Sequence, residues 1–390
     1  MILPSVEAWI DECIAGDPVG PPTPSREDEA AFDRLALEAF ASQYERVPLY
    51  RRLCDLRGVR PGEARHWTEI PAAPADLFRG GLGVPDEPGS VVFLSSGTTQ
   101  GAGRRSRHAL APSSYALYRR SSLATFRAMV LPDSPGPMSV LLLGPSSRTH
   151  PASSLGHMYQ FVIDEFGARD GGALPGPGRV AQCFDADGRL DVDAAICWLE
   201  AAAASTAPVL VLALTSTTTA LLEALRARRI ELRLPADSRL VDTGGSKGGR
   251  TMSRAGILKG AWRFLHIPAY LCIGEYGMTE LVSQSYDDAW RSRWSGALLP
   301  RSKVGPRWSR TIAVDPVTLA PVARGERGIL RHVDLASAAG IPAVQTLDVG
   351  FATGRGVEVL GRATGSEARG CSHLLSALSE AIPGPEEGEA

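Results

Sequence analysis

Short apolar runs alternate with longer amphipathic patterns through the middle of the chain. The runs have the aliphatic and β-branched composition of buried strands, and they lie at 91–94, 140–143, 209–214 and 240–241. Between and after them, apolar residues recur at the spacing of a helix face, which predicts helices over 113–130, 153–167, 192–204 and 216–228. Strands that alternate with helices in this way indicate a largely parallel sheet covered by helices on both faces. The sequence therefore predicts an α/β protein.

The two ends of the chain differ from the middle. Residues 1–57 have helical patterns, with Ser5 and Ser25 as the expected N-caps of two helices. After about residue 305, shorter β-like runs predict a small β-rich subdomain, and they lie at 310–314, 328–332, 343–346 and 357–360. The last residues are rich in proline, glycine and glutamate, a composition typical of disorder. We expect four parts: a helical segment at 1–80, an αβ core at 81–305, the β-rich subdomain at 306–378 and a disordered tail at 379–390.

Composition narrows the class of protein. The 390-residue chain is 44% hydrophobic and 22% charged, as in ordinary globular proteins, and its formal net charge of -2 argues against nucleic acid as a partner. Its six cysteines have neither the spacing of a zinc site nor that of a disulfide framework, so reduced thiols are expected. Glu200 and Pro208 interrupt the one long apolar stretch, and no signal-peptide pattern begins the chain. We expect a soluble cytoplasmic protein without a membrane span.

The strand predicted at 91–94 runs directly into a loop of hydroxyls and glycines. Its sequence is Ser95-Ser96-Gly97-Thr98-Thr99-Gln100-Gly101. The glycines permit positive φ and a close approach of backbone N–H groups to a ligand, and the hydroxyls add donors, a combination that can cradle phosphate oxygens. The loop has neither the Gly-Lys-Ser/Thr of a Walker loop nor Gly-x-Gly-x-x-Gly. A polar turn after a strand is the alternative interpretation.

A second strand, predicted at 269–273, leads into the turn Gly274-Glu275-Tyr276-Gly277-Met278-Thr279-Glu280. In an open parallel sheet, ligands bind at the carboxyl ends of the strands, so this turn is a candidate site. Glu280 beside a triphosphate is a suitable Mg²⁺ ligand, because Mg²⁺ is held by one or two carboxylates together with phosphate oxygens. The alternative is a helix that begins here, with Thr279 as its cap and Glu280 in its first turn.

Two further segments carry candidate ligand-binding groups. An apolar strand leads into a loop with Gly244, Gly245 and Lys247, one of only three lysines. The glycines of this loop permit close approach to a planar or anionic ligand, and a flexible surface loop is the alternative. Gln345–Gly350 is an apolar strand that ends in Asp348, whose carboxylate can accept hydrogen bonds from paired ribose hydroxyls. An Asp-x-Gly hairpin turn explains the same residues.

Among the cysteines, Cys371 differs from the other five. It lies in Arg369-Gly370-Cys371-Ser372, outside any apolar pattern, and nearby positive charge lowers the pKa of a thiol and favours the thiolate. The other cysteines are expected to be small buried hydrophobes. The segment 153–157 is a candidate wall of the substrate pocket, in which His157 is expected to be structural. The sequence has neither Gly-x-Ser-x-Gly nor His-Glu-x-x-His, which excludes the serine hydrolases and zinc proteases that carry these motifs.

Together and in this order, these segments resemble motifs of the adenylate-forming superfamily. Residues 95–99 are similar to its phosphate loop, 276–280 to its Tyr-Gly-x-Thr-Glu motif, Asp348 to its ribose-binding aspartate and Arg362 to the arginine that follows. Within the superfamily, the chain is most similar to the acyl-protein synthetase (LuxE) family of fatty acid reductase systems. The features of that similarity are Arg105-Ser106-Arg107-His108, Gly244-Gly245-x-Lys247 and Glu367-x-Arg-Gly-Cys371-Ser, and the resemblance covers about residues 70 to 378.

The resemblance implies a fold of stacked, largely parallel sheets covered by helices. It also implies that ATP and Mg²⁺ serve to activate a carboxylic acid, expected to be a fatty acid, as an acyl-adenylate with release of pyrophosphate. The acyl group would then pass to the Cys371 thiol and on to an acyl reductase or another acceptor protein. The implied nucleotide-binding residues are Ser95, Ser96, Gly97, Thr98, Thr99, Gly244, Gly245, Tyr276, Gly277, Thr279 and Asp348. Glu280 would hold the metal, and Cys371, Lys247 and Arg362 would act in catalysis.

The chain departs from the family pattern in three places. Gln100 and Ser246 stand where the family usually has glycine and tryptophan. About 40 residues follow Asp348, too few for the mobile C-terminal domain that supplies a catalytic lysine in typical ligases. This favours an internal cysteine acceptor, or another cation such as Lys247 or Arg362. Two alternatives stay open. One is a ligase that forms an amide, or a thioester with coenzyme A or a carrier protein, with the cysteine structural; the other is a non-catalytic scaffold homologue.

Overall fold

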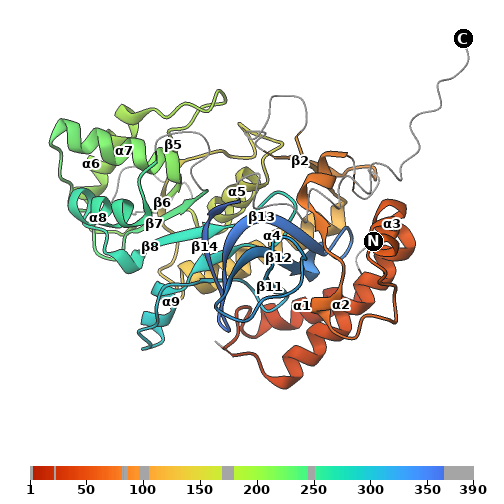
Figure 1. The fold of residues 1–390 in the computed structure, drawn as a ribbon. Helices are drawn as coiled ribbons and strands as arrows, with labels where there is room; N and C mark the ends of the chain where they lie inside the picture. Colours follow the sequence, from red (N-terminus) through yellow and green to blue (C-terminus); the bar gives the residue numbers. More distant parts are fainter. Residues whose placement is uncertain are drawn as a thin grey trace, which may run out of the picture.

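The computed structural model describes residues 3–21, 23–80, 82, 87–95, 105–168, 180–244 and 251–363 (Figure 1). Among the predicted site residues, those outside these ranges are Ser96, Gly97, Thr98, Thr99, Gly245, Lys247 and Cys371, and the tail expected to be disordered also lies outside them. Those within the ranges are Ser95, Gly244, Tyr276, Gly277, Thr279, Glu280, Asp348 and Arg362.

The chain begins with helices, as the sequence predicts: α1 (Pro4–Ala15), α2 (Arg26–Arg46) and α3 (Pro48–Leu56). Ser25 caps α2, because its side chain accepts a hydrogen bond from the N–H of Asp28 at 3.1 Å. The prediction that Ser5 caps the first helix is wrong. α1 already begins at Pro4, whose fixed φ suits the first helical position, and the Ser5 hydroxyl donates instead to Glu38 at 2.8 Å.

One part of the large sheet is parallel. Its strands lie side by side in the order β5 (Val180–Gln182), β4 (Ser139–Leu143), β6 (Val209–Leu214), β7 (Arg239–Thr243) and β8 (Cys272–Tyr276). They are connected by helices α5 (Ser154–Phe166), α6 (Val192–Ala203), α7 (Thr215–Arg228) and α8 (Arg254–Leu265) (Figure 1). β4 is buried along its whole length and β6 along nearly all of it, as expected for central parallel strands. The predicted alternation of strands and helices is confirmed.

The other part of the sheet is antiparallel and continues directly from β8. Its strands, in order across the sheet, are β9 (Ser285–Asp287), β10 (Lys303–Val304), β14 (Val357–Arg362), β13 (Ala343–Ala352), β12 (Arg327–Asp334) and β11 (Ser309–Val314). β1 (Ala73–Pro74) pairs in parallel with β13, which brings the sheet to twelve strands in the described part of the chain. The β-rich region predicted after residue 305 is confirmed, while the four-part division of the chain stays a prediction.

The strand predicted at 91–94 is present but lies outside the parallel sheet. β2 (Val91–Leu94) pairs antiparallel with β3 (Arg107–Leu110) in a separate two-stranded sheet, and α4 (Pro112–Val130) follows. The prediction of a buried strand is wrong for all of its residues but Phe93, since Leu94 is exposed and the two valines are partly buried. A short apolar run can form a strand in either environment, and periodicity alone does not separate the two.

The strand predicted at 269–273 is shifted along the chain. Ala269–Leu271 forms a single 3-10 turn, and the strand β8 begins after it. Gly274 therefore lies inside the strand rather than in the turn that follows. A glycine suits this interior position, because a Cβ there would come within 2.9 Å of the Asp287 carboxylate on the neighbouring strand β9.

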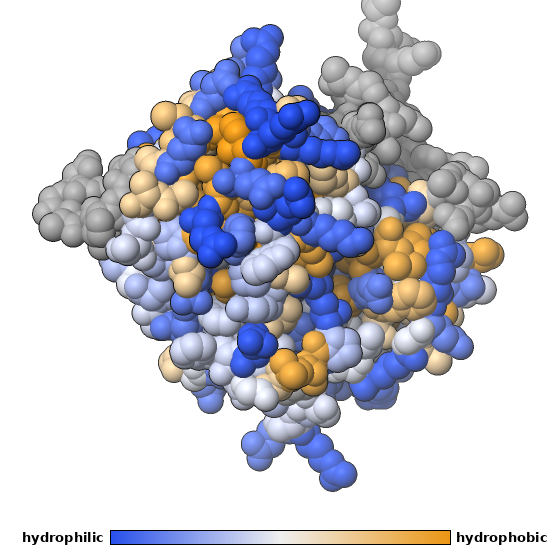
Figure 2. Space-filling model, turned by 90° about the vertical axis from the view of Figure 1, so that its left-hand side faces the viewer, coloured by the Kyte–Doolittle hydropathy of each residue, from blue (hydrophilic) through white to orange (hydrophobic). Residues whose placement is uncertain are grey.

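Apolar side chains from the sheet and from the helices on it form one large core, and two smaller clusters lie among the strands β11–β14. The side of the molecule that carries α6, α7 and α8 shows mainly hydrophilic groups, with separate apolar side chains between them (Figure 2). Among the residues that the structure describes, no helix combines the length and apolarity needed to cross a membrane.

Candidate functional site

A cavity of about 310 Å³ lies where the carboxyl ends of β2, β7 and β8 face β13 and β14. Residues far apart in the sequence line it, and the predicted site residues among them are Ser95, Gly277, Thr279, Glu280, Asp348 and Arg362. The topology of the sheet explains this convergence, because β8 leads into the turn at 277–280 whereas β13 and β14 carry Asp348 and Arg362. The structure brings these residues together, and the role of each stays a prediction.

The turn after β8 forms one wall of the cavity. Tyr276 is the last residue of β8 and pairs with the antiparallel strand β9, so the chain reverses between them. Glycine suits position 277, since a Cβ there would lie 2.6 Å from Oε1 of the buried Glu275 and would displace that carboxylate. Thr279 and Glu280 lie in a turn that leads to β9, so the alternative of a helix capped by Thr279 is wrong.

Glu280 is a carboxylate in the cavity wall that is only 5% exposed. Burial raises the pKa of Glu280, and a hydrogen bond with the Ser106 hydroxyl and the positive charges of Arg362 and Arg79 partly offset this effect. A cation in the cavity would further favour the ionised form, so this residue fits a Mg²⁺ ion that arrives with a triphosphate. In the described ranges, no three His, Cys, Asp or Glu side chains lie close enough together to hold a metal by themselves.

Asp348 lies on β13, directly opposite Arg362 of β14. Its Oδ2 accepts a hydrogen bond from the Tyr276 hydroxyl at 2.8 Å, and its Oδ1 lies 3.4 Å from Arg362 Nε. The expectation that the strand ends at Asp348 is wrong, and so is the alternative of a hairpin turn, because β13 continues past a bulge between Val349 and Gly350. Asp348 thus lines the cavity from within a strand, with its side chain 18% exposed.

No sequence motif marks His332, yet it contacts this site. It is buried on β12, and its Nε2 lies 3.1 Å from the Tyr276 hydroxyl while its Nδ1 lies 2.8 Å from the Thr311 hydroxyl. Burial lowers the pKa of His332 to about 4, so the ring is neutral at pH 7. Its run, 328–332, is apolar and β-like, and only the pairing of β11, β12 and β13 places this histidine beside the site.

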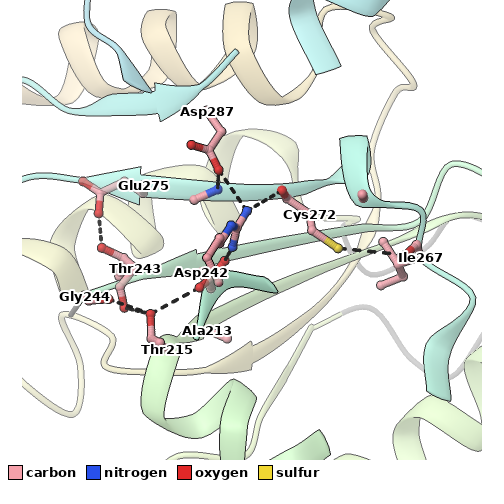
Figure 3. A network of polar contacts seen from close by, with 12 residues as sticks. Ala213, Thr215, Asp242, Thr243, Gly244, Ile267, Cys272, Glu275 and Asp287 are labelled. Carbon is pink, nitrogen blue, oxygen red and sulfur yellow. Dashed lines mark hydrogen bonds and ion pairs between the residues drawn. The ribbon is translucent and has the colours of Figure 1, made fainter. Parts of the chain in front are cut away.

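β7 and β8 end beside each other with polar residues (Figure 3). Thr243 donates a hydrogen bond to the Glu275 carboxylate across the two strands. The hydroxyl of Thr215, at the start of α7, lies 2.6 Å from the carbonyl oxygen of Gly244. Gly244 has a φ of 93°, a conformation that glycine adopts without strain, and it leads into the segment that carries Lys247.

A cluster of charged side chains surrounds Asp287, which is buried on β9. Arg301 and Arg254 pair with its Oδ2 at 2.8 and 2.9 Å, and Lys303 lies 3.4 Å from its Oδ1. The backbone N–H of Gly274 also donates to this carboxylate at 2.8 Å. Burial alone would raise the pKa of Asp287, but the three cations hold it below its usual value. The cluster ties β8, β9 and β10 to the start of α8.

Another part of the cavity wall comes from α4 and α5, and its residues are Tyr118, Ser154, Leu155 and Met158. Part of the predicted pocket segment 153–157 therefore does line the cavity. His157 makes two hydrogen bonds within the protein: its Nε2 donates to the carbonyl of Pro151 at 2.9 Å, and its Nδ1 accepts from the Tyr115 hydroxyl at 2.7 Å. The prediction that this histidine is structural is confirmed.

No protein-family model and no curated protein matches this chain in sequence. Among solved structures, the chain is similar to 2-hydroxyisobutyryl-CoA ligase in an open conformation in complex with 2-HIB-AMP and CoA. The TM-score is 0.59 at 13% identity, over 87% of this chain and 76% of the ligase. The same ligase in its postadenylation state gives a TM-score of 0.58, over 87% of this chain and 68% of the ligase. The chain has the fold of this ligase.

The predicted fold class, that of the adenylate-forming enzymes, is confirmed by this similarity. ATP-bound MatB from Rhodopseudomonas palustris is also similar, with 18% identity and a TM-score of 0.45 over 70% of this chain. The chain spans about half of MatB, 47% of its length. At these identities the likeness concerns the fold.

Proposed function

We propose that this protein uses ATP to activate a carboxylic acid as an acyl-adenylate, with release of pyrophosphate. One observation carries the proposal. Glu280, Asp348 and Arg362, which match superfamily motifs in the sequence, lie around one cavity, and Tyr276 is hydrogen-bonded to Asp348 at its edge. The surrounding chain has the fold of an adenylate-forming ligase. Unrelated surface turns have no reason to converge in this way.

The nucleotide would lie along β13 and β14. Asp348 can accept hydrogen bonds from the ribose hydroxyls, because Tyr276 and Arg362 hold its carboxylate while it faces the cavity. Ser95, with the hydroxyls and N–H groups of 96–99 that follow it, would hold the phosphate oxygens. The glycines at 244 and 245 would let the backbone approach the nucleotide closely.

The first reaction joins a carboxylate to the α-phosphorus of ATP. A carboxylate oxygen attacks that phosphorus, the bond from phosphorus to the bridging oxygen breaks, and pyrophosphate leaves. Mg²⁺, held by Glu280 together with phosphate oxygens, would neutralise part of the charge on the triphosphate. Arg362 and Lys247 are the cations that would stabilise charge near the reacting atoms. Leu155 and Met158 offer an apolar wall to the acyl group of a fatty acid.

In the second step the acyl group would pass to Cys371. The thiolate attacks the carbonyl carbon, the bond from that carbon to the adenylate oxygen breaks, and AMP leaves with the electron pair. Arg369, two residues before Cys371 in the sequence, would favour the thiolate. Support for this step comes from the sequence alone, since Cys371 lies outside the described residues. The resulting thioester would deliver its acyl group to an acyl reductase or to another acceptor protein.

Coenzyme A is the second candidate acceptor. The ligase that shares this fold was solved in complex with 2-HIB-AMP and CoA, which favours the alternative of an acyl-CoA or acyl-carrier ligase in which Cys371 is structural. A non-catalytic scaffold is the remaining alternative, and a wild type that does not bind ATP would support it.

The test is an intact-mass measurement on the wild type and on Cys371→Ala, each incubated with Mg·ATP and a panel of carboxylic acids. We expect an acyl-sized mass gain, labile to hydroxylamine, in the wild type and its loss in the variant. The variant should still release pyrophosphate in the presence of the acid. Pyrophosphate release that depends on added coenzyme A, without a mass gain, would establish the second acceptor. A wild type that binds no ATP would overturn both.

A further inference from the structure

Four side chains form a continuous hydrogen-bonded series that ends at the cavity. Thr311 on β11 contacts His332 on β12 at 2.8 Å, and His332 contacts Tyr276 on β8 at 3.1 Å. Tyr276 contacts Asp348 on β13 at 2.8 Å. β12 and β8 are not neighbours in the sheet, so the contact between His332 and Tyr276 joins its parallel and antiparallel parts. Tyr276 and Asp348 match the sequence motifs of the proposed nucleotide site, whereas Thr311 and His332 belong to none of these motifs.

The chemistry of these groups sets the direction of each hydrogen bond. Burial, and then the negative charge of Asp348, raise the pKa of Tyr276 well above its usual value, so it is a neutral phenol whose single proton goes to the carboxylate. The Tyr276 oxygen must then accept from His332 Nε2. A neutral imidazole that donates from Nε2 accepts at Nδ1, where the Thr311 hydroxyl donates. Tyr276 and His332 each donate one hydrogen bond and accept one, so a change of the His332 tautomer would redirect the Tyr276 proton away from Asp348.

We propose that His332 and Thr311 are positioning residues for the ribose of the bound nucleotide. They keep the Tyr276 proton on Oδ2 of Asp348, and this leaves Oδ1 facing Arg362 and the cavity as an acceptor for the ribose hydroxyls. Their effect passes through Tyr276 and Asp348 rather than through contact with the nucleotide. This inference rests on the proposed function, since it requires ATP in the cavity.

The other tautomer of the His332 ring shows what His332 and Thr311 prevent. Without the Thr311 hydroxyl, His332 can carry its proton on Nδ1, and Nε2 then becomes an acceptor for the Tyr276 proton. Asp348 would lose its only hydroxyl donor among the described residues and would keep Arg362 as its partner on Oδ1. Arg362 would then be the side chain that holds the Asp348 carboxylate. Because this contact is to Oδ1, the oxygen proposed to accept from the ribose, the affinity for ATP would fall.

The test compares the binding of ATP and of 2′,3′-dideoxy-ATP by calorimetry. The wild type should prefer ATP. His332→Phe, which fills the space without a donor, should lose about tenfold in affinity for ATP, the effect of one hydrogen bond to a charged group, and should bind the dideoxy nucleotide as the wild type does. His332→Gln, whose amide can still donate to Tyr276, should recover most of the preference. Thr311→Val changes the volume very little and should shift the preference in the same direction, so it serves if His332→Phe does not fold.

His150→Phe is the matched control, because Nδ1 of His150 also pairs with a threonine hydroxyl, that of Thr149 at 2.9 Å, outside this series. It should leave the preference for ATP unchanged. If His332→Phe lost the same affinity for both nucleotides, or kept the wild-type preference for ATP, the inference would be overturned and the proposed function would stay intact. A wild type that binds neither nucleotide would overturn the proposed function, and the inference with it.

Discussion

Two carboxylates in neighbouring parts of the sheet, the buried Asp287 and the partly buried Asp348, have opposite surroundings. Asp287 is met by three cations and a backbone N–H group, all within 3.4 Å. Asp348 is met by a neutral phenol at 2.8 Å and by the Arg362 guanidinium at 3.4 Å, and it lines the cavity. The charge of Asp287 is balanced inside the protein, whereas that of Asp348 faces the space where a ligand would bind.

This difference predicts a structural role for the charge of Asp287 and, under the proposed function, a binding role for the charge of Asp348. A carboxylate that cations surround on every side has no oxygen left for a ligand, and its removal leaves those cations facing each other. A carboxylate held by a neutral donor keeps an acceptor for a ligand, and its removal disturbs less of the fold. Mutation of Asp287 should therefore act on stability first, and mutation of Asp348 on binding first.

The largest effect is expected for Asp287→Asn. It should lower the free energy of unfolding by about 3 kcal/mol, the lower end of the range for breaking a buried ion pair, because its three cations remain partly exposed to solvent. Urea denaturation at pH 7 measures this. Asp187→Asn is the control: Asp187 is 71% exposed and pairs with Arg189, so its loss should change stability by less than about 1 kcal/mol.

The loss of stability in Asp287→Asn is expected to depend on pH. The pKa of Asp287 is lower in the folded protein than in the unfolded chain, so the stability it contributes is present at neutral pH and is lost as the pH falls through the folded pKa. The gap in stability between the wild type and Asp287→Asn should therefore narrow in acid. A difference in stability of the same size at neutral and at acidic pH would contradict the assignment of a structural charge to Asp287.

A smaller effect, on binding rather than stability, is expected for Asp348→Asn. The affinity for ATP should fall about tenfold or more, because an amide replaces a charged acceptor of ribose hydroxyls. The free energy of unfolding should change by less than about 1 kcal/mol, since Tyr276 can donate to the amide oxygen. Calorimetry with ATP and urea denaturation measure the two quantities. A large loss of stability with unchanged affinity would place Asp348 in the same class as Asp287.

The position of Asp348 at the cavity could be predicted from the sequence, and the cluster around Asp287 could not. Asp348 lies in a predicted strand and resembles a motif residue, so its convergence with the other motif residues was predictable. The partners of Asp287 are Arg254, Arg301 and Lys303, which come from separate elements and share no spacing or pattern. Only the pairing of β8, β9 and β10 brings them to one carboxylate.

The errors in the predicted strands have the same origin, because they too depend on which segments pair in the tertiary structure. From β4 to β7, every strand and helix except the short strand β5 was predicted, because buried strands are apolar and helices that cover a sheet have an apolar face. The apolar run 91–94 also forms a strand, but its partner β3 has no clear pattern, so the separate two-stranded sheet was not predictable. His332 shows the limit most clearly, since it lies in a strand without any recognised motif and gains its contacts with Tyr276 and Thr311 from tertiary structure.

The smallest effect on stability is expected for Glu280→Gln. Glu280 adds a third carboxylate to the comparison, one that is buried in the cavity wall. The pKa of Glu280 is raised in the folded protein, so its ionised form is disfavoured there and destabilises the fold at pH values above that pKa. Glu280→Gln should therefore raise the free energy of unfolding at pH 8 by an amount on the order of 1 kcal/mol, a size common for single stabilising changes. The gain should shrink as the pH falls and the carboxyl of the wild type becomes protonated.

This gain in stability should come with a loss in binding, as expected for a carboxylate that is retained for a cation. Mg²⁺ should strengthen the binding of ATP to the wild type more than to Glu280→Gln. Glu358→Gln, at an exposed position on β14, is the matched control and should change neither quantity. If Glu280→Gln lowers stability at pH 8 and responds to Mg²⁺ as the wild type does, Glu280 belongs with Asp287 as a structural charge, and the cavity loses its predicted metal ligand.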